Sequence, residues 1–274
     1  MKIGIIGTGN MGKILIQSLV ESEAISPSQL FITNRNLTKA REIQKEIPLL
    51  TICETVSQTI KSADLIFLCV KPLDMHPILF KHNHLFTAEK CLVSITSPVS
   101  VTQLESVVDC SCARLIPSIT NRVLSGVSLL SFSTNCWTDW KEILFSLAEK
   151  ISTPVEIDEN ITRVSSDIVS CGPAFFSYIT QRFIDGAVEE TKISKSQATL
   201  LASQMLIGLG ELLKKNVYTL PSLQEKVCVK GGVTGEGIKV LESEIGDMFQ
   251  KVFRATHEKF EEDLSNTKKQ FKTY

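Results

Sequence analysis

Short apolar runs alternate with segments of helical periodicity through the first half of the chain. The runs have the β-branched and aliphatic character of strands, and they span Lys2 to Ile6, Leu30 to Thr33, Leu49 to Cys53, Asp64 to Val70, Cys91 to Thr96, Ala113 to Ile116 and Val127 to Phe132. Between them, segments such as Met11 to Val20 and Leu37 to Ile47 carry apolar residues at helical spacing. This alternation predicts right-handed βαβ units and a parallel sheet, so we expect a doubly wound α/β domain over residues 1–158.

The pattern changes after Thr153 to Ile157, where the strand signals stop. The apolar residues that recur on helical faces from there on are Phe176, Ile179, Phe183 and Ala187, then Leu201, Met205, Leu209 and Leu212, then Phe249, Val252, Phe253, Phe260 and Leu264. We therefore expect an all-helical domain over residues 159–274. So small a bundle cannot bury all of these faces, which predicts that the domain dimerises. The basic and polar stretch from Lys268 to Tyr274 is expected to fray.

Composition and charge exclude several function classes. Lys plus Arg number 29 against 30 Asp plus Glu, so the chain lacks the basic excess typical of nucleic-acid binding. No apolar run approaches the roughly 20 residues of a membrane-spanning helix, and the opening MKIGIIG breaks into Gly-Thr-Gly-Asn too early for a signal peptide. We expect a cytoplasmic protein that binds neither nucleic acid nor membrane. The eight Cys contain no C-x-x-C, which favours reduced core residues. The four His lack convincing metal-ligand spacing apart from His82-Asn83-His84, so no metal is expected.

A glycine-rich turn directly follows the first predicted strand. Gly7, Thr8, Gly9, Asn10, Met11 and Gly12 form the pattern G-x-G-x-x-G and open the next predicted helix. In such a turn Gly7 allows the tight bend, Gly9 lets a pyrophosphate approach the backbone, and Gly12 lets helix and strand pack closely. The alternative is an ordinary glycine-rich turn. The strand before it and the helix after it favour a dinucleotide site.

Residues at the ends of the following strands extend this candidate site. Asn34 and Arg35 stand where an acid would bind the ribose 2′-hydroxyl of NAD. Arg35 can pair with a 2′-phosphate, which favours NADP(H) over NAD. The alternative is that Arg35 is a solvated surface residue. Val70, Lys71 and Pro72 end a later strand, and Thr96 and Ser97 end the next; we assign them all to the cofactor site. Lys71 has two interpretations: it contacts the ribose or the substrate, or it is a solvated residue at the start of a helix. The same two interpretations apply to Arg114.

The second half holds one segment with an unusual number of glycines. Four occur between Lys230 and Gly237, in Lys-Gly-Gly-Val-Thr-Gly-Glu-Gly. Free backbone N–H groups at a helix start form a nest for an anion such as a carboxylate, and the Thr234 hydroxyl can serve a reacting nitrogen or oxygen. A simple turn explains two glycines but not four. Ser170 to Ala174 also interrupts a helical pattern; Cys171 there has no His nearby in sequence, which favours packing over nucleophilic catalysis.

Taken together, these segments resemble pyrroline-5-carboxylate reductases over essentially the whole chain. The resemblance rests on Gly7 to Gly12, Asn34-Arg35, Val70-Lys71-Pro72, Arg114 to Pro117, Gly172-Pro173-Ala174, Asp185 and Gly231 to Thr234. More narrowly, Ile116 to Arg122, Val169 to Phe175 and Val227 to Gly237 look like the late-competence branch of that family, known from bacilli.

The resemblance implies a Rossmann-type N-terminal domain and a helical C-terminal domain that interlocks with its twin. The expected assembly is a homodimer or a higher assembly of such dimers. It also implies reduction of the cyclic imine Δ1-pyrroline-5-carboxylate to proline by NADPH. Thr234 matches the family's active-site Thr and is expected to serve the ring nitrogen as the catalytic residue. The substrate contacts are expected to be Lys230, Gly231, Gly232, Val233, Thr234 and Ser118.

The chain departs from the family pattern where the substrate is expected. The family's Ser-Pro-Gly-Gly is Val229-Lys230-Gly231-Gly232 here, its Gly-Ser-Gly-Pro is Ser170 to Pro173, its Met-Pro-Asn is Ile116 to Ser118, and Gln181 replaces a Glu. Hydroxyl and amide donors are lost, and a basic residue enters the anion-binding loop. Two hypotheses follow: an active imine reductase, and a catalytically altered paralogue that binds NADP(H) in a regulatory or interaction role. Action on a different small carboxylate is a distant third.

Overall fold

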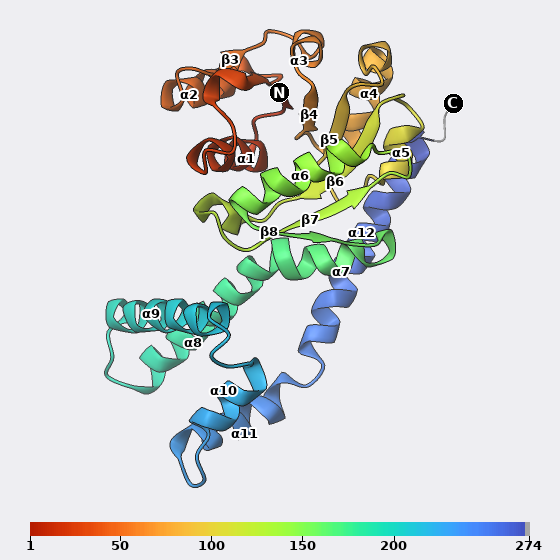
Figure 1. Ribbon diagram of the computed structural model, residues 1–274. Helices are drawn as coiled ribbons and strands as arrows, with labels where there is room; N and C mark the ends of the chain where they lie inside the picture. Colours follow the sequence, from red (N-terminus) through yellow and green to blue (C-terminus); the bar gives the residue numbers. More distant parts are fainter. Residues whose placement is uncertain (272–274) are drawn as a thin grey trace. The chain divides into compact units, whose positions relative to one another are not determined.

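The first part of the chain is built on one eight-stranded sheet with strand order β3-β2-β1-β4-β5-β6-β7-β8 (Figure 1). The computed structural model describes residues 1–271. Its strands are β1 (Ile3–Ile6), β2 (Leu30–Thr33), β3 (Thr51–Ile52), β4 (Leu65–Leu68), β5 (Cys91–Ser94), β6 (Ser111–Ile116), β7 (Val127–Phe132) and β8 (Thr153–Glu156). These strands lie close to the predicted apolar runs, and the order β3-β2-β1-β4-β5 is that of a doubly wound nucleotide-binding sheet. The predicted α/β fold class is confirmed.

One strand pair differs from the expected parallel sheet. β6 and β7 are antiparallel, with Ala113 opposite Phe132 and Ile116 opposite Leu129, whereas the other paired strands are parallel. The cause is the length of the connection, because residues 117–126 are too few for the crossover of a dozen or more residues that parallel neighbours need. The 3₁₀ helix η3 (Ile119–Val123) occupies half of this link.

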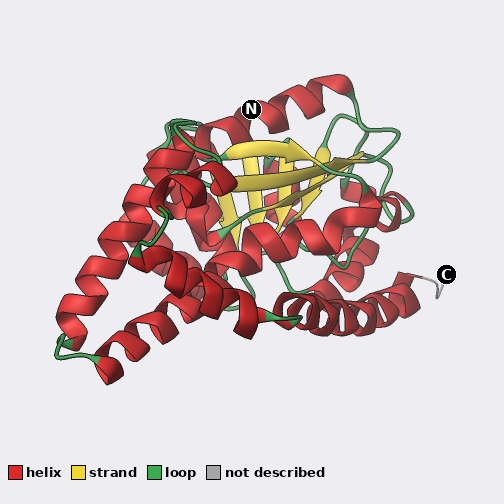
Figure 2. Ribbon diagram, turned by 90° about the horizontal axis from the view of Figure 1, so that it is seen from below, coloured by secondary structure: helices red, strands yellow, loops and turns green. Residues whose placement is uncertain are grey.

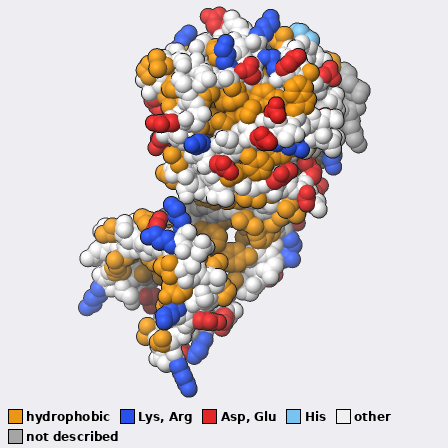
Figure 3. Space-filling model, viewed as in Figure 1, with side chains coloured by type: hydrophobic (Ala, Val, Ile, Leu, Met, Phe, Trp, Pro, Cys, Tyr) orange, Lys and Arg blue, Asp and Glu red, His pale blue; other side chains and the backbone are white. Residues whose placement is uncertain are grey.

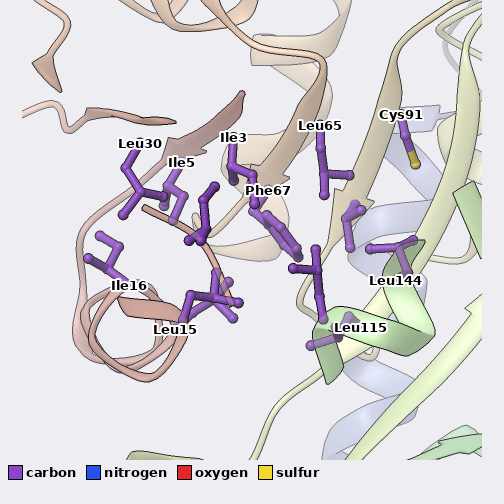
Figure 4. Close-up of a cluster of buried hydrophobic side chains, with 14 of the residues drawn as sticks. Ile3, Ile5, Leu15, Ile16, Leu30, Leu65, Phe67, Cys91, Leu115 and Leu144 are labelled. Atoms are coloured by element: carbon purple, nitrogen blue, oxygen red, sulfur yellow. The ribbon is translucent and has the colours of Figure 1, made fainter. Parts of the chain in front are cut away.

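Helices cover both faces of the sheet (Figure 2). In this part of the chain they are α1 (Asn10–Glu21), α2 (Leu37–Glu46), α3 (Val56–Ser62), α4 (Pro72–His82), α5 (Val101–Glu105), α6 (Thr138–Ile151) and α7 (Thr162–Ser166). Alternate residues along a strand point to opposite faces and so enter different cores. Ile5 and Phe67 pack with Leu15 and Ile16 of α1 and Leu144 of α6 (Figure 4). On the other face, side chains of β1, β4, β5 and β6 pack with α3, α4 and α5.

The rest of the chain is helical. After the π-helix η5 (Asp167–Cys171) come α8 (Gly172–Glu190), α9 (Lys195–Lys214), α10 (Leu220–Val227), α11 (Val233–Ile245) and α12 (Met248–Phe271). Local signals set these limits: Ser194 caps the first turn of α9 by accepting the N–H of Gln197, and Gly246 ends α11 with a φ of 47° that favours glycine. The predicted all-helical second part is confirmed, and η5 is the interruption expected near Ser170.

Two compact units divide the chain differently from the expected boundary at residue 158. The first unit comprises residues 1–173 together with 255–271, and the second comprises Ala174–Arg254. α12 therefore returns to the first unit, where Phe271 lies edge-on to the His76 ring at 4.8 Å between centroids. The expectation that the chain frays from Lys268 is wrong as far as Phe271, because α12 runs to that residue; its remaining part, residues 272–274, lies outside the described residues.

Candidate functional site

The turn between β1 and α1 requires glycine at two of its positions. Gly7 has a φ of 102°, and a Cβ there would lie 2.4 Å from the Cys69 carbonyl oxygen; a Cβ on Gly12 would lie 2.2 Å from the carbonyl oxygen of Gly7. The turn is also tied to the sheet, since the Gly7 N–H donates to the Thr33 carbonyl at 2.9 Å. Gly7 and Gly12 thus have the tight-turn and close-packing roles expected from the sequence.

The middle of the same turn is open. A Cβ on Gly9 would meet no atom within 4 Å, and Gly9 precedes α1 with no side chain capping the helix start. The buried Thr8 hydroxyl also has no hydrogen-bond partner. Free N–H donors, a helix dipole and an unpartnered hydroxyl beside an open backbone fit a pyrophosphate, so the residues present suit a dinucleotide.

A cleft of about 620 Å³ extends from this turn along the ends of β1, β2 and β4. It is lined by Ile6, Gly7, Gly9, Thr33, Asn34, Arg35, Asn36, Lys39, Val56, Cys69, Val70, Lys71, Asp74, Pro77 and Ile78. The structure thus brings together the Gly-rich turn, Asn34-Arg35 and Val70-Lys71. Of the other expected contacts, Pro72 is the first residue of α4, and Thr8 and Asn10 line a neighbouring cleft of about 190 Å³.

Asn34 and Arg35 divide two tasks at the end of β2. The Asn34 side-chain oxygen accepts the Thr8 N–H at 3.1 Å, and its amide donates to the Asn36 carbonyl at 2.9 Å, so Asn34 holds the Gly-rich turn in place. Arg35 is exposed at the cleft. With Asn34 engaged in this way, the cleft at the end of β2 has a guanidinium where NAD-binding sheets of this kind have an acid, and a guanidinium suits a 2′-phosphate.

Sequence reasoning missed Lys39 as a site residue. This exposed Lys lies in the first turn of α2 and lines both clefts. Lys13 lies close by but pairs with Glu46 at 2.6 Å, so its charge is already balanced. The signal was present in the sequence, because Lys39 follows Arg35 by four residues at the start of a helix, where a phosphate is favoured.

The β4 side of the cleft contains Cys69 and Lys71. Burial raises the pKa of the Cys69 thiol to about 12, so this side chain is a neutral thiol at physiological pH. Lys71 is the N-cap of α4 and is exposed at the cleft. This position is compatible with both interpretations of Lys71, a ligand contact and a solvated residue at the start of a helix.

Arg114 is a structural residue rather than a ligand-facing one. Its side chain is 1% exposed and makes a two-pronged pair with Glu159, with both N···O distances at 3.2 Å. It also donates to the Thr162 hydroxyl at 2.6 Å and to the Ser97 carbonyl at 3.2 Å. Burial lowers the pKa of the Arg114 guanidinium, and Glu159 opposes that effect. Arg114 therefore fastens the chain around Ser97 and Thr162 to the sheet.

Ser118 lies in an equally enclosed place. It is 1% exposed, its hydroxyl donates to the Val169 carbonyl at 2.8 Å, and the same oxygen accepts the Thr120 hydroxyl at 2.9 Å. Its N–H donates to the Asn121 side chain at 2.7 Å. The Ser118 hydroxyl is thus engaged within the fold, where it connects η3 to the π-helix η5.

The loop from Lys230 to Thr234 belongs to the second unit. Gly231 has a φ of 76°, and a Cβ on Gly232 would lie 2.9 Å from the Val229 side chain, so both positions favour glycine. Gly235 and Gly237 lie in α11 with open space around them. No side chain caps the start of α11, so its first N–H groups, those of Val233 and Thr234 included, remain available to an anion.

Other chemistry is limited in the part of the chain that the structure describes. All eight Cys are free thiols, and burial raises the pKa of Cys171, although Arg163 opposes this effect. Among residues 1–271 no group of three or more His, Cys, Asp or Glu side chains is arranged to hold a metal ion. Within the same residues no helix combines the length and the apolar character that crossing a membrane requires.

Comparison with known protein families finds two matches along the chain. Residues 2–98 match the family described as "NADP oxidoreductase coenzyme F420-dependent". Residues 159–263 match the family described as "Pyrroline-5-carboxylate reductase dimerisation". The description of the first match names NADP together with coenzyme F420.

Individual relatives match over nearly the full length. ComE operon protein 4 of Bacillus subtilis is 55% identical over 271 residues, which cover 99% of either chain. Pyrroline-5-carboxylate reductase 3 of the same organism is 29% identical over 268 residues, covering 95% of this chain and 96% of that one. A crystal structure of Plasmodium falciparum pyrroline carboxylate reductase with NADP bound has a TM-score of 0.82 at 21% identity, over 97% and 98% of the two chains.

Proposed function

Because the chain belongs to the pyrroline-5-carboxylate reductase family, we propose that it reduces Δ1-pyrroline-5-carboxylate, or a closely related cyclic imine, with NADPH. The observation that carries the proposal is the cleft of about 620 Å³, where an open glycine turn stands beside Arg35 in place of an acid. This arrangement favours a dinucleotide with a 2′-phosphate. Imine reduction then follows from the family and from Thr234 at the start of α11.

The residues of the first unit bind and orient the cofactor. We assign the pyrophosphate to the N–H groups of the turn at Gly9, and the 2′-phosphate to Arg35 together with Lys39. Val70 and Lys71 follow β4 in the same cleft and Pro72 begins α4, so these residues would hold a ribose of the cofactor. NADPH supplies the hydride that reduces the imine carbon. The contribution of these residues is to hold the donor in one orientation.

The Lys230–Thr234 loop is assigned to the substrate. Its free N–H groups at the start of α11 bind the carboxylate, with the helix dipole and the charge of Lys230 supporting the anion. The Thr234 hydroxyl donates a hydrogen bond to the ring nitrogen, which gains a proton from solvent when the adjacent carbon gains the hydride. Donors fixed in advance stabilise the charge that changes during the reaction.

The test of this assignment is Thr234→Ala. We expect turnover of Δ1-pyrroline-5-carboxylate, followed by NADPH absorbance, to fall about a hundredfold, because the loss of one preorganised hydrogen-bond donor at a centre of changing charge typically costs that much. NADPH affinity should not change, and Thr234→Ser should keep most of the activity. Thr102→Ala is the matched control, since Thr102 is also the second residue of a helix, α5, and is exposed. Full activity in Thr234→Ala would remove Thr234 from the mechanism.

A second candidate function is favoured by the same loop. Val229 and Lys230 stand where the family has Ser and Pro, and Val229 is 65% exposed. A chain that has lost this hydroxyl and retained the cofactor cleft fits a paralogue that binds NADP(H) in a regulatory or interaction role. Wild-type protein that binds NADPH but oxidises none of it with Δ1-pyrroline-5-carboxylate would favour this candidate over the reductase.

We also propose that the protein works as a homodimer, or a higher assembly of such dimers, in the cytoplasm. Support for the dimer comes from the matched dimerisation family and from exposed apolar side chains on the helices of the second unit, such as Phe176 and Phe183. Support for the location comes from the eight free thiols, which suit a reducing compartment.

A further inference from the structure

A buried ion pair joins α7 to the first residue of the π-helix η5, next to Ser97 of the expected cofactor site. The Asp167 carboxylate is fully buried and accepts a hydrogen bond from Arg163 at 2.7 Å, four residues earlier in α7. Its other oxygen accepts the Thr256 hydroxyl at 2.8 Å and lies 3.8 Å from His257 Nδ1. A carboxylate removed from water persists only with such partners, so Asp167 is well suited to hold Arg163 in one place.

Arg163 is restrained on more than one side. Its guanidinium carbon lies 5.4 Å from the centre of the Phe260 ring, and its Nη2 is also 3.5 Å from Cys171 Sγ. The side chain is only 16% exposed, and its Nε has no hydrogen-bond partner. An arginine fixed in this way presents its remaining donors in a defined direction.

That direction leads to the segment after β5, residues 95–100, which we call the Ser97 loop. Arg163 Nη1 reaches the Ser97 hydroxyl at 3.5 Å, and Arg114 holds the carbonyl of the same residue. Thr267 of α12 donates to the next carbonyl, that of Pro98, at 3.0 Å. The Ser97 loop is therefore held by two guanidinium groups and by a returning helix.

The position of this loop in the sheet indicates what it serves. β5 lies beside β4 on the side away from β2, and Arg35 follows β2. A dinucleotide crosses the edge of such a sheet with its two halves on opposite sides of the switch point between β1 and β4. When Arg35 takes the adenosine half, the nicotinamide half faces the ends of β4 and β5, where the Ser97 loop begins.

We propose that Arg163, held by Asp167, is a positioning residue that orders the Ser97 loop for the nicotinamide half of the cofactor. The inference rests on the proposed function for its cofactor but not for its imine substrate. A loop ordered in advance loses less entropy when the ligand binds. Loss of Arg163 should then lower the affinity for ligands that contain nicotinamide and leave the affinity for ligands that lack it unchanged.

The test compares two ligands in Arg163→Gln: NADPH, and 2′-phospho-ADP-ribose, which lacks the nicotinamide ring. Calorimetric titration should show NADPH binding weakened about three- to tenfold, the effect of one hydrogen bond, with 2′-phospho-ADP-ribose unchanged. Asp167→Asn should act in the same way, because Arg163 loses its carboxylate partner. Arg163→Lys keeps the positive charge but lacks the several N–H donors of the planar guanidinium. Its affinity for NADPH should therefore lie between those of wild type and Arg163→Gln.

Arg122→Gln is the matched control, since Arg122 forms an exposed pair with Glu21 in the same unit, and it should change neither affinity. Equal weakening of both ligands in Arg163→Gln would mean a general structural role and overturn the proposal, as would no effect on either. If Asp167→Asn does not fold, the comparison of the Arg163→Lys and Arg163→Gln variants still decides. Wild type that binds NADPH without reducing the imine would contradict the proposed reaction alone; wild type that fails to bind NADPH would overturn both.

Discussion

Arg35 and Arg114 show how much the surroundings of a residue determine its role. Both follow the same sequence logic, a basic residue in or just after a strand of the nucleotide-binding sheet. Arg114 is 1% exposed and hydrogen-bonded to Glu159, Thr162 and Ser97, whereas Arg35 is exposed at the cleft. The sequence could not separate the two, because the carboxylate that pairs with Arg114 lies 45 residues further along the chain.

The first prediction concerns Arg35. Arg35→Ser should weaken NADPH binding about tenfold to a hundredfold, because hydrogen bonds to charged groups contribute about 1.5–3 kcal/mol, and should leave NADH binding unchanged. Fluorescence titration of both reduced cofactors measures this. Arg41→Ser is the control, since Arg41 is exposed on α2 and does not line the cleft. Equal weakening of NADPH and NADH would mean that Arg35 does not recognise the 2′-phosphate.

The residues that sequence reasoning missed have physical reasons in common. Lys39 was recognisable from its helical position, but Arg163 and Asp167 were not, because an acid and a base four residues apart usually form an exposed pair of little consequence. Their importance comes from burial beneath α12, which brings in Thr256 from far along the chain. Periodicity reports which face of a helix is apolar and does not report which distant segment covers it.

At the level of elements, the turn between β1 and α1 was the most predictable feature, whereas β7 was predicted with its bounds but not with its direction. The glycine pattern constrains backbone geometry directly, so its consequences could be read without knowing the rest of the fold. A run such as Val127–Phe132 is buried in the sheet and contains no directional signal, so parallel and antiparallel pairing look alike in the sequence. Only the shortness of the link at residues 117–126 determines the antiparallel pairing with β6.

The turn supports a paired prediction on Gly9 and Gly12. Gly12→Ala should lower the free energy of unfolding by about 3 kcal/mol, because the new methyl group would overlap the Gly7 carbonyl oxygen at 2.2 Å. This is opposite to the gain of about 1 kcal/mol that the same change brings in an unobstructed helix. Gly9→Ala should change stability by less than about 0.5 kcal/mol, since its Cβ meets no atom within 4 Å.

For NADPH binding, Gly9→Ala should be the more damaging of the two substitutions, whereas Gly12→Ala is the more damaging for stability. Gly9→Ala should abolish most binding, because its methyl group occupies the space through which a pyrophosphate approaches the backbone. Urea unfolding together with NADPH titration of both variants checks the prediction. A Gly9→Ala protein that binds NADPH normally would mean that the pyrophosphate does not lie on this turn.

At the scale of the whole molecule, the division into units was predicted only in part. The change from strands to helices near residue 158 is plain in the sequence, and the helical character of the chain beyond it is confirmed. The return of residues 255–271 to the first unit was missed. α12 is a single amphipathic helix that belongs to both units, and its apolar spacing is the same whether its face packs on a sheet domain or a helical one.

The exposed apolar side chains of the second unit lead to the last prediction. Figure 3 shows hydrophobic side chains at the surface of the second unit. Phe183 of α8 is 67% exposed and Leu201 of α9 is 62% exposed. If a second copy covers this surface, Phe183→Asp places a charge in a desolvated contact and should weaken association by about 2 kcal/mol or more. Sedimentation equilibrium should then find wild type at twice the chain mass, and Phe183→Asp shifted toward the single chain at micromolar concentration.

Leu49→Asp is the control, because Leu49 is 69% exposed but lies in the first unit, and its mass should stay that of wild type. A wild-type mass for Phe183→Asp combined with a reduced mass for Leu49→Asp would place the interface on the first unit instead.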